Sequence, residues 1–154
     1  MMKILRKYGW IALLVIAADQ VTKRLALSLE NPVTLIPGVL GLRQTRNTGV
    51  AFSLLSSVPW LVTVLSVVVL VLGGLFLRRY RLGTLTCIGA ILIAGGALSN
   101  IISRVIEGSV IDMIEFLFVN FAVFNAADIA LTVGCGLLIL SLLIRPDEWK
   151  PRHE

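Results

Sequence analysis

One apolar stretch decides the fold, residues 123–144, which read VFNAADIALTVGCGLLILSLLI. Its length and hydrophobicity predict a helix that spans a membrane. A carboxylate near the start of this helix, Asp128, has apolar residues on both sides. An ionised side chain in hydrocarbon is costly and is normally found only where it faces a partner, a cavity or water. We therefore treat Asp128 as a candidate functional residue.

The composition of the whole chain agrees with a membrane protein. The 154 residues are 57% hydrophobic and only 15% charged, with a net charge of +5. The basic residues sit mostly at the ends of apolar runs, which is an orientation signal rather than a nucleic-acid footprint. We find no basic helix with interleaved aromatic residues, so we expect no nucleic-acid partner. The sequence predicts one membrane-embedded domain over residues 1–154.

Four apolar segments have the length of membrane spans. They cover about residues 8–27, 58–77, 84–105 and 125–144. The first could be a cleaved signal peptide, but no convincing small-residue cleavage site follows it, and we favour a retained span. Small residues within the spans predict close helix packing, namely Gly73, Gly74, Gly95, Gly96, Gly134 and Gly136.

Basic residues divide unevenly between the two sides of these spans. The side with both chain ends holds nine: Lys3, Arg6, Lys7, Arg78, Arg79, Arg81, Arg145, Lys150 and Arg152. The other side holds five: Lys23, Arg24, Arg43, Arg46 and Arg104. The positive-inside rule then predicts that both termini are cytoplasmic.

Two segments, residues 28–57 and 107–124, are then expected on the outer side. The first contains prolines, glycines and short β-prone pieces such as VTLI, and predicts a small extended or sheet-like cap. The second is too apolar for a free loop, and we expect it to return to the membrane surface and pack there. The predicted fold class is all-α integral membrane, a four transmembrane helix bundle with a small extracytoplasmic β-like cap.

Polar residues gather at the outer ends of these spans. Asn100, Ser103 and Arg104 are spaced at i, i+3 and i+4, so they share one helical face. Asn125 and Asp128 are three residues apart and also share a face. Because the third span ends outward and the fourth begins outward, these polar ends lie at similar depth. Interhelical hydrogen bonding without catalysis would also explain the two asparagines.

Two further acids belong to the same level of the membrane. Asp19 and Lys23 are four residues apart in the first span, and an ion pair is the simplest role for them. Asp112 lies in the second outer segment, where it could also be an ordinary solvated acid. Two carboxylates that face each other in a low-dielectric pocket cannot easily both ionise, so one keeps a proton. Such a pair can activate water with one member and protonate with the other.

Other hydrolytic chemistries find little support in the sequence. The only histidine, His153, lies in the polar tail, which argues against Ser-His-Asp, Cys-His and HExxH zinc sites. Cys87 and Cys135 lie inside apolar runs and have no metal-ligand spacing. We therefore expect neither a metal nor an organic cofactor.

The same residues carry a resemblance to a known family, lipoprotein signal peptidase (signal peptidase II), over nearly the whole chain. The matching pieces are DQVTK (19–23), RNTGVAFSLL (46–55), GGALSNIISRVIEGSVIDMIEF (95–116) and FNAADIALTVG (124–134). The resemblance implies an aspartic endopeptidase of the bacterial cytoplasmic (inner) membrane, with its active site toward the outer face. It would remove the signal peptide from prolipoproteins by cutting before a cysteine that carries diacylglycerol.

The resemblance also implies roles for individual residues. Asp112 and Asp128 would be the catalytic dyad. The implied substrate-binding and supporting residues are Asn47 in the cap, Asn100 and Arg104 at the substrate backbone, Asn125 beside the dyad, and Asp19 with Lys23 at the first helix. The implied partners are the diacylglyceryl-prolipoprotein substrate and membrane lipid, and we expect a monomer.

The chain departs from the family pattern at one place. Where the family usually reads G-N-x-x-D-R, this sequence has SNIISR, so Ser99 replaces a glycine and Ser103 replaces an acid. The replaced acid is not one of the two implied catalytic ones. A hydroxyl still forms hydrogen bonds but brings no charge to Arg104. One hypothesis is therefore a family member whose activity is weakened by Ser103.

Two hypotheses place the protein in a different functional class. A serine–lysine peptidase would use Lys23 with Ser53, Ser99 or Ser103, but the neighbouring acids would keep this lysine protonated and unable to act as a base. A small transporter or lipid-binding scaffold would use the acids as a proton relay. The four predicted spans show no inverted repeat, which argues mildly against transport.

Overall fold

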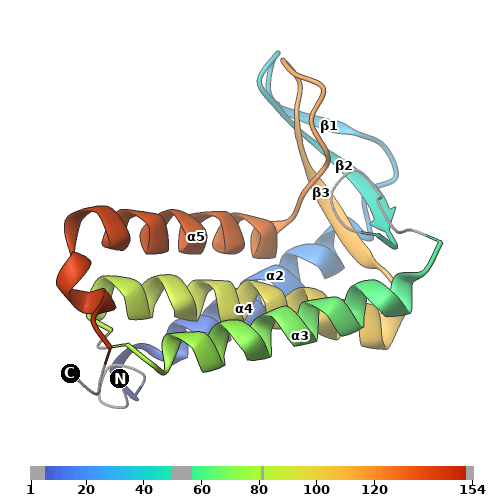
Figure 1. The fold of residues 1–154 in the computed structure, drawn as a ribbon. Coiled ribbons are helices and arrows are strands. Elements are labelled where there is room, and N and C mark those ends of the chain that lie inside the picture. The colour runs from blue at the N-terminus through green and yellow to red at the C-terminus, as the bar shows by residue number, and fades with distance from the viewer. Residues whose placement is uncertain (1–5, 50–56, 81, 152–154) are drawn as a thin grey trace.

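The computed structural model describes residues 6–49, 57–80 and 82–151 of the chain. Long helices lie along a roughly common direction, and a small sheet rises from one end of them (Figure 1). In chain order the helices are α2 (Trp10–Ala26), α3 (Pro59–Leu77), α4 (Thr84–Glu107) and α5 (Ala126–Ile144). Their bounds agree closely with the four predicted apolar segments.

The molecule is a mostly helical, membrane-type protein. Within the described residues, three helices are long and apolar enough to cross a membrane: α3, α4 and α5, with 19, 24 and 19 residues. α3 buries only Val62 inside the protein, and its other faces expose large apolar side chains that lipid would cover. α2 has only 17 residues. Helix length therefore does not confirm the predicted count of four spans.

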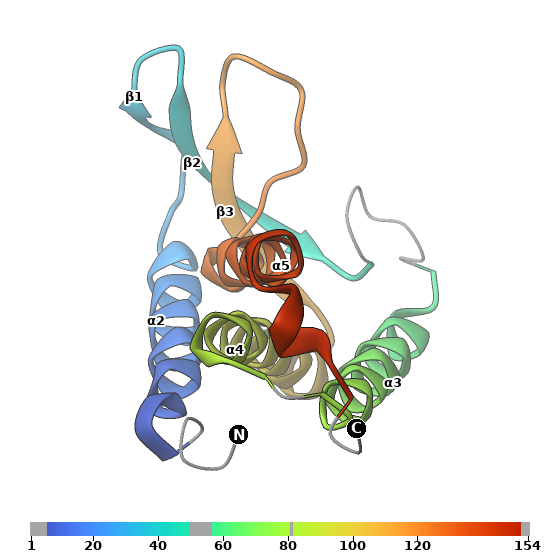
Figure 2. The same cartoon turned by 60° about the vertical axis from the view of Figure 1, so that its left-hand side comes forward.

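α4 is the central helix, and it packs against α2, α3 and α5 (Figure 2). Its contact with α5 depends on two facing glycines, because a Cβ on Gly134 would lie 2.7 Å from the Gly89 carbonyl oxygen. This crossing confirms the predicted packing role for Gly134. The prediction was wrong for Gly73, Gly74 and Gly136, where no described atom lies within 4 Å of an added Cβ. Those three positions are on open helix surfaces.

The sheet contains three antiparallel strands in the order β1 (Val33–Ile36), β2 (Leu40–Asn47) and β3 (Val110–Phe116). β1 and β2 come from the first outer segment, which was predicted to be sheet-like. β3 comes from the second outer segment, which was predicted only to return to the membrane surface. The observed pairing of β2 with β3 corrects that expectation, because β3 completes the sheet of the cap.

The missed strand has a physical explanation. Val110, Ile111, Asp112 and Met113 are all buried, so both faces of β3 are covered at this point. A strand covered on both faces does not show the alternation of apolar and polar residues that identifies a half-exposed strand. Ile111 and Met113 also form the apolar cluster that joins the sheet to Ala26 at the end of α2.

The opposite end of the bundle is closed by a short 3-10 helix, η2 (Pro146–Trp149). Its Glu148 Oε2 accepts hydrogen bonds from Thr86 Oγ1 at 2.6 Å and from the Gly83 amide at 3.1 Å. A carboxylate at this position satisfies the amide of the N-cap residue Gly83 and complements the helix dipole of α4. The start of α2 lies at the same end of the bundle (Figure 1).

Candidate active site

The candidate site lies where the sheet meets the bundle, and its first fixed point is the start of α5. Asn125 is the N-cap residue, and its side-chain oxygen accepts a hydrogen bond from the Asp128 amide at 3.0 Å. In return, Asp128 Oδ2 accepts one from the Asn125 amide at 3.1 Å. This reciprocal capping box fixes the position of the acid in the first turn, where the helix dipole favours negative charge.

The second carboxylate reaches the site from β3. Asp112 is 3% exposed. Its Oδ2 accepts a hydrogen bond from Asn47 Nδ2 at 2.9 Å, and its Oδ1 accepts one from Asn125 Nδ2 at 2.6 Å. The pKa of Asp112 is raised to about 6. Burial is the largest cause and the charge of Asp128 adds to the rise, while the hydrogen bonds from the two asparagines oppose it.

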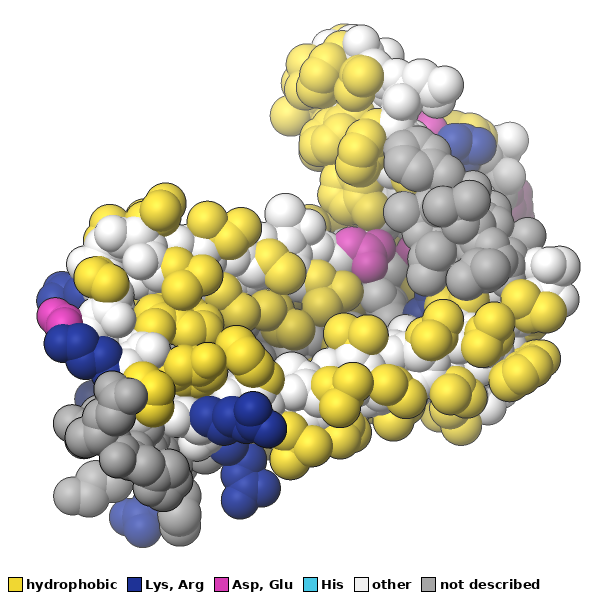
Figure 3. Space-filling view, viewed as in Figure 1, with side chains coloured by type: hydrophobic (Ala, Val, Ile, Leu, Met, Phe, Trp, Pro, Cys, Tyr) yellow, Lys and Arg dark blue, Asp and Glu magenta, His cyan; other side chains and the backbone are white. Residues whose placement is uncertain are grey.

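Asn125 therefore contacts both acids, Asp112 through its side-chain nitrogen and Asp128 through the capping box. Asp128 Oδ1 accepts a further hydrogen bond from Asn100 Nδ2 at 2.9 Å. Asp128 is only partly buried, whereas Asp112 is almost completely buried. Acidic surface is visible at the base of the hollow between the sheet and the helices (Figure 3). The two carboxylates thus differ in environment, as the two members of an acid–base pair do.

Arg104 reaches toward the same region from α4. Its Nη2 donates to the Gly49 carbonyl oxygen at 2.6 Å. Its Nε is buried and has no hydrogen-bond partner among the described residues. A buried donor without a partner is unusual and identifies a position where a ligand group could bind. The motif that contains Gly49 continues into residues 50–55, which lie outside the described residues.

A charged pair lies directly behind these groups. The predicted ion pair of Asp19 and Lys23 is present, with 2.6 Å between Lys23 Nζ and Asp19 Oδ2. Asp19 is completely buried, and its Oδ1 accepts a hydrogen bond from the Ala127 amide at 2.9 Å. Lys23 Nζ also donates to Asn100 Oδ1 at 2.8 Å. The pair therefore ties α2 to the start of α5 and to α4.

Sequence reasoning missed one member of this network, Gln20. Its Nε2 donates to Ser99 Oγ at 2.9 Å and to Ser103 Oγ at 3.1 Å. The available signal was its place in a polar run, between Asp19 and Lys23, inside a helix that is otherwise apolar. All eight predicted site residues lie in or beside this network: Asp19, Lys23, Asn47, Asn100, Arg104, Asp112, Asn125 and Asp128.

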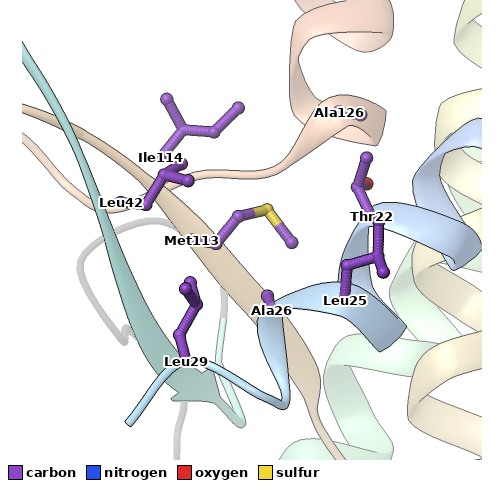
Figure 4. Close-up of a pocket in the computed structure, with 8 residues that line it drawn as sticks. All are labelled: Thr22, Leu25, Ala26, Leu29, Leu42, Met113, Ile114 and Ala126. Carbon is purple, nitrogen blue, oxygen red and sulfur yellow. The ribbon is translucent and has the colours of Figure 1, made fainter. Parts of the chain in front are cut away.

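An apolar cavity of about 250 Å³ lies beside β3, next to the end of α2 (Figure 4). It is lined by Thr22, Leu25, Ala26, Leu29, Leu42, Met113, Ile114 and Ala126. Its almost wholly apolar lining suits an alkyl group.

The arrangement combines two carboxylates with a set of amide donors. Carboxylates that share one proton can act as base and acid toward a water molecule and a peptide bond. Among the residues that the structure describes, no group of three His, Cys, Asp or Glu side chains is placed to hold a metal ion. The chemistry open to these side chains is acid–base catalysis.

Comparison with known proteins agrees with this geometry. The family model described as Signal peptidase (SPase) II matches residues 11–144, which is most of the chain. The chain belongs to the signal peptidase II family. The match covers nearly all of α2, all of α3 to α5 and the whole sheet, so it includes every residue of the candidate site.

Individual members of the signal peptidase II family are similar over nearly their full length. A lipoprotein signal peptidase of Brevibacillus brevis is 34% identical over 143 residues, covering 89% of this chain and 95% of that protein. One from Lactococcus lactis is 38% identical over 131 residues, covering 83% and 87%. A bacterial membrane enzyme solved by the in meso method at 2.3 Å superposes with a TM-score of 0.77 at 28% identity, covering 92% of this chain and 90% of that one.

Proposed function

We propose that the protein is an aspartic endopeptidase of the bacterial cytoplasmic membrane, formed by one domain over residues 1–154. Its proposed reaction removes the signal peptide from diacylglyceryl-modified prolipoproteins by cutting before the lipidated cysteine. Asp112 and Asp128 are the proposed catalytic pair. The observation that carries the proposal is that Asn125 binds both carboxylates, at 2.6 Å to Asp112 and through the capping box to Asp128.

The difference in burial assigns the two acids their proposed roles. Asp112 is the less exposed of the two, and its raised pKa of about 6 lets it hold a proton at a pH where an ordinary carboxyl is ionised. Asp128 takes a proton from water, whose oxygen attacks the carbonyl carbon of the scissile bond. Asp112 gives its proton to the carbonyl oxygen. When the tetrahedral intermediate collapses, the C–N bond breaks and the leaving nitrogen takes a proton from Asp128. Asp112 takes back a proton from one of the two hydroxyls, whose oxygen becomes the carbonyl of the new carboxyl group, and the pair returns to its starting state.

Amide and guanidinium groups support this reaction from around the pair. Asn47, on β2, lines the substrate side of Asp112, to which it donates at 2.9 Å. Arg104 offers its unpaired Nε to the substrate backbone. Hydrogen-bond donors that face developing negative charge are a large part of enzymatic rate enhancement. Asn100 keeps the Asp128 carboxylate in place. The ion pair of Asp19 and Lys23 holds α2 against α4 and α5.

The proposed topology places this site at the outer face of the membrane. α2 serves as the fourth span, and its exposed Leu13 and Leu14 are consistent with contact to lipid. Both termini are cytoplasmic, in agreement with the excess of basic residues on that side of the predicted spans. A lipid-modified cysteine lies at the outer surface, and the signal peptide can enter from the lipid. We propose that the protein acts as a monomer, without nucleic acid.

The contacts of Lys23 disfavour the serine–lysine hypothesis. Lys23 Nζ lies 3.2 Å from Ser103 Oγ, which is a suitable distance for such a pair. However, the ammonium is also 2.6 Å from Asp19 Oδ2, and an ammonium paired with a carboxylate does not act as a base. Ser99 and Ser103 are both buried, so a peptide bond has no access to their hydroxyls. Ser53, the third serine considered, lies outside the described residues.

The test is cleavage of a purified diacylated prolipoprotein by the purified protein in detergent. Asp112→Asn and Asp128→Asn are each expected to lower turnover by about a thousandfold or more, because each removes one partner of the acid–base pair. The matched control is Asp147→Asn, the same change at an exposed acid of the C-terminal segment, which should cleave like the wild type.

Two outcomes would contradict the proposal. An Asp112→Asn protein that is folded and still cleaves at the wild-type rate would remove the aspartic mechanism. A folded wild-type protein that does not cleave diacylated prolipoprotein would favour a transporter or scaffold. Circular dichroism and size-exclusion chromatography of each variant establish whether the protein is folded.

A further inference from the structure

We propose that Ser103 is a positioning residue of the peptidase reaction, which acts through Lys23 and sets the pH range of cleavage. Ser103 gives Lys23 a neutral hydroxyl in place of a second carboxylate. The Lys23 charge is therefore left to act on Asn100 and, through it, on the proposed catalytic pair. This inference rests on the proposed function, and it concerns the position where the chain departs from its family.

The first step is the environment of Lys23, which is 4% exposed. Among the described residues, its ammonium has one carboxylate partner, Asp19, at 2.6 Å. Its further partners are neutral oxygens, Asn100 Oδ1 at 2.8 Å and Ser103 Oγ at 3.2 Å. A buried charge with one counter-charge and two dipoles keeps a strong field at its neighbours, because little water screens it.

The counter-charge on Asp19 is itself shared among several donors. Asp19 Oδ2 accepts a hydrogen bond from Ser99 Oγ at 2.7 Å in addition to its contact with Lys23. Asp19 Oδ1 accepts one from the Ala127 amide at 2.9 Å, at the positive end of the α5 dipole. These donors stabilise the carboxylate, and their positive ends oppose part of its electrostatic field at Lys23. The neutralisation of Lys23 by Asp19 is correspondingly incomplete.

The second step is the path from Lys23 to the catalytic pair. An asparagine amide has one acceptor end and one donor end. Lys23 holds the Asn100 oxygen at 2.8 Å, which turns the Asn100 nitrogen toward Asp128 Oδ1 at 2.9 Å. The same oxygen also accepts a hydrogen bond from Asn125 Nδ2 at 3.3 Å. The charge of Lys23 thus fixes the amide orientation that stabilises the Asp128 carboxylate.

The third step is the pocket around Ser103, which is arranged to receive an anion. Two donors converge on the single Ser103 oxygen, Lys23 Nζ at 3.2 Å and Gln20 Nε2 at 3.1 Å. The hydroxyl hydrogen is used elsewhere, in a bond to the Ser99 carbonyl oxygen at 3.2 Å. A carboxylate at this position would accept both donors and remain ionised. Its charge would then offset that of Lys23.

The charged groups around Lys23 come from every element packed against it. They are Asp19 on α2, Arg104 on α4, Asp112 on β3 and Asp128 on α5, with Arg24 and Glu107 forming a partly exposed pair at 3.8 Å nearby. The inner group has two cations and three carboxylates, so it is neutral when the catalytic pair holds one proton. A fourth carboxylate at position 103 would leave excess negative charge and favour proton uptake by the pair.

The test compares Ser103→Asp with Ser103→Asn, which have nearly the same shape and differ in charge. Purified variants cleave diacylated prolipoprotein over a range of about pH 4–9, and kcat/KM is measured at each pH. We expect Ser103→Asp to move the whole profile to higher pH by about one unit. Ser103→Asn should keep the wild-type profile, even if its rate is lower. Lys23→Met removes the positive charge directly and should move the profile in the same direction as Ser103→Asp.

Three outcomes would overturn the inference. If Ser103→Asp and Ser103→Asn have the same profile, the charge at this position does not reach the catalytic pair. If Ser103→Asp gains turnover at every pH without a shift, Ser103 simply weakens the enzyme. If Ser103→Asp does not fold, an unshifted Lys23→Met profile is enough to reject the idea. A wild-type protein without cleavage at any pH would instead reject the proposed function.

Discussion

The two ends of the bundle each have a carboxylate at the start of a helix, and the two carboxylates differ in their surroundings. At each of them a carboxylate caps the start of a helix: Glu148 at the start of α4 and Asp128 at the start of α5. Glu148 has its donors, Gly83 and Thr86, and no second acid joins it among the described residues. Asp128 has its donors too, but a second buried acid, Asp112, shares Asn125 with it.

This difference helps to distinguish a carboxylate that only caps a helix from one that could take part in a reaction. A single capped carboxylate is stabilised by its partners and has no chemical task. A second carboxylate adds a charge that helix capping does not require, and its burial raises the pKa of Asp112 to about 6. The extra acid, rather than the capped one, is the feature that supports the proposed active site at the sheet end.

Among changes that keep both acids, the largest expected effect comes from removing the Asn125 donor to Asp112 at the sheet end. Asn125→Ser keeps a residue that caps helices well, but its side chain is too short to reach Asp112. Loss of a hydrogen bond to a charged group costs about 1.5–3 kcal/mol, so we expect kcat to fall by about tenfold to a hundredfold. The measurement is steady-state cleavage of diacylated prolipoprotein.

The matched change at the opposite end is Thr86→Val, which removes the hydroxyl that donates to Glu148 at 2.6 Å. This variant should have wild-type turnover and a lower unfolding temperature. The comparison of the two ends would fail if Thr86→Val lost as much turnover as Asn125→Ser.

A smaller effect is expected when the contacts of Glu148 at the start of α4 are weakened. Glu148→Gln weakens the contacts to Gly83 and Thr86, and we expect it to lower the free energy of unfolding by about 1–3 kcal/mol. Gly83→Ala should do the same, because an added Cβ would overlap the Glu148 carboxylate. The measurement is thermal unfolding in detergent, with turnover as the control that should not change.

The double variant, Gly83→Ala with Glu148→Gln, tests whether the two losses of stability have one cause. Both single changes remove the same contact, so their combination should be little worse than either alone. Fully additive losses would show that Gly83 and Glu148 act independently, and would weaken the assignment of Glu148 as the cap of α4.

The smallest expected effect is on the pH dependence of stability. Burial raises the pKa of Asp112 from 3.8 to about 6, so the folded protein keeps a proton that the unfolded chain has lost. The stability from this proton is fully present below the lower value and is lost as the pH rises to about 6. Unfolding temperatures measured from about pH 4 to about pH 7 should therefore fall more in the wild type than in Asp112→Asn. Parallel curves for the two proteins would contradict this.

Much of the fold could be predicted because the lipid-facing helices depend on simple physical signals. A run of apolar residues has few alternatives to a helix in hydrocarbon, and α3, α4 and α5 begin and end near their predicted bounds. β3 could not be predicted in the same way, since its pairing partner lies in another segment and its buried faces hide the alternation. The packing of Glu148 on α4 depends on a contact between distant residues, which no local pattern signals.

The residues of the candidate site could be proposed from the sequence, whereas most of the contacts between them could not. Asp128 and Asn125 share a helix turn, and spacing alone brings them together. Asp112 comes from the missed strand, so its contact with Asn125 required the tertiary structure. Ser99 and Ser103 stood out as departures from a family pattern, and Ser103 also shares a helical face with Asn100 and Arg104. Their convergence with Gln20 is a property of the packed helices α2 and α4.

The contact between Glu148 and α4 has a consequence for biosynthesis. Glu148 is 62 residues further along the chain than Thr86 and 65 further than Gly83. When α4 leaves the ribosome and enters the membrane, the Gly83 amide and the Thr86 hydroxyl have no carboxylate partner until that later stretch has been translated. A nascent chain that is released early therefore carries an uncapped helix in the bilayer, and such a frayed end is a natural point of attack for quality-control proteases.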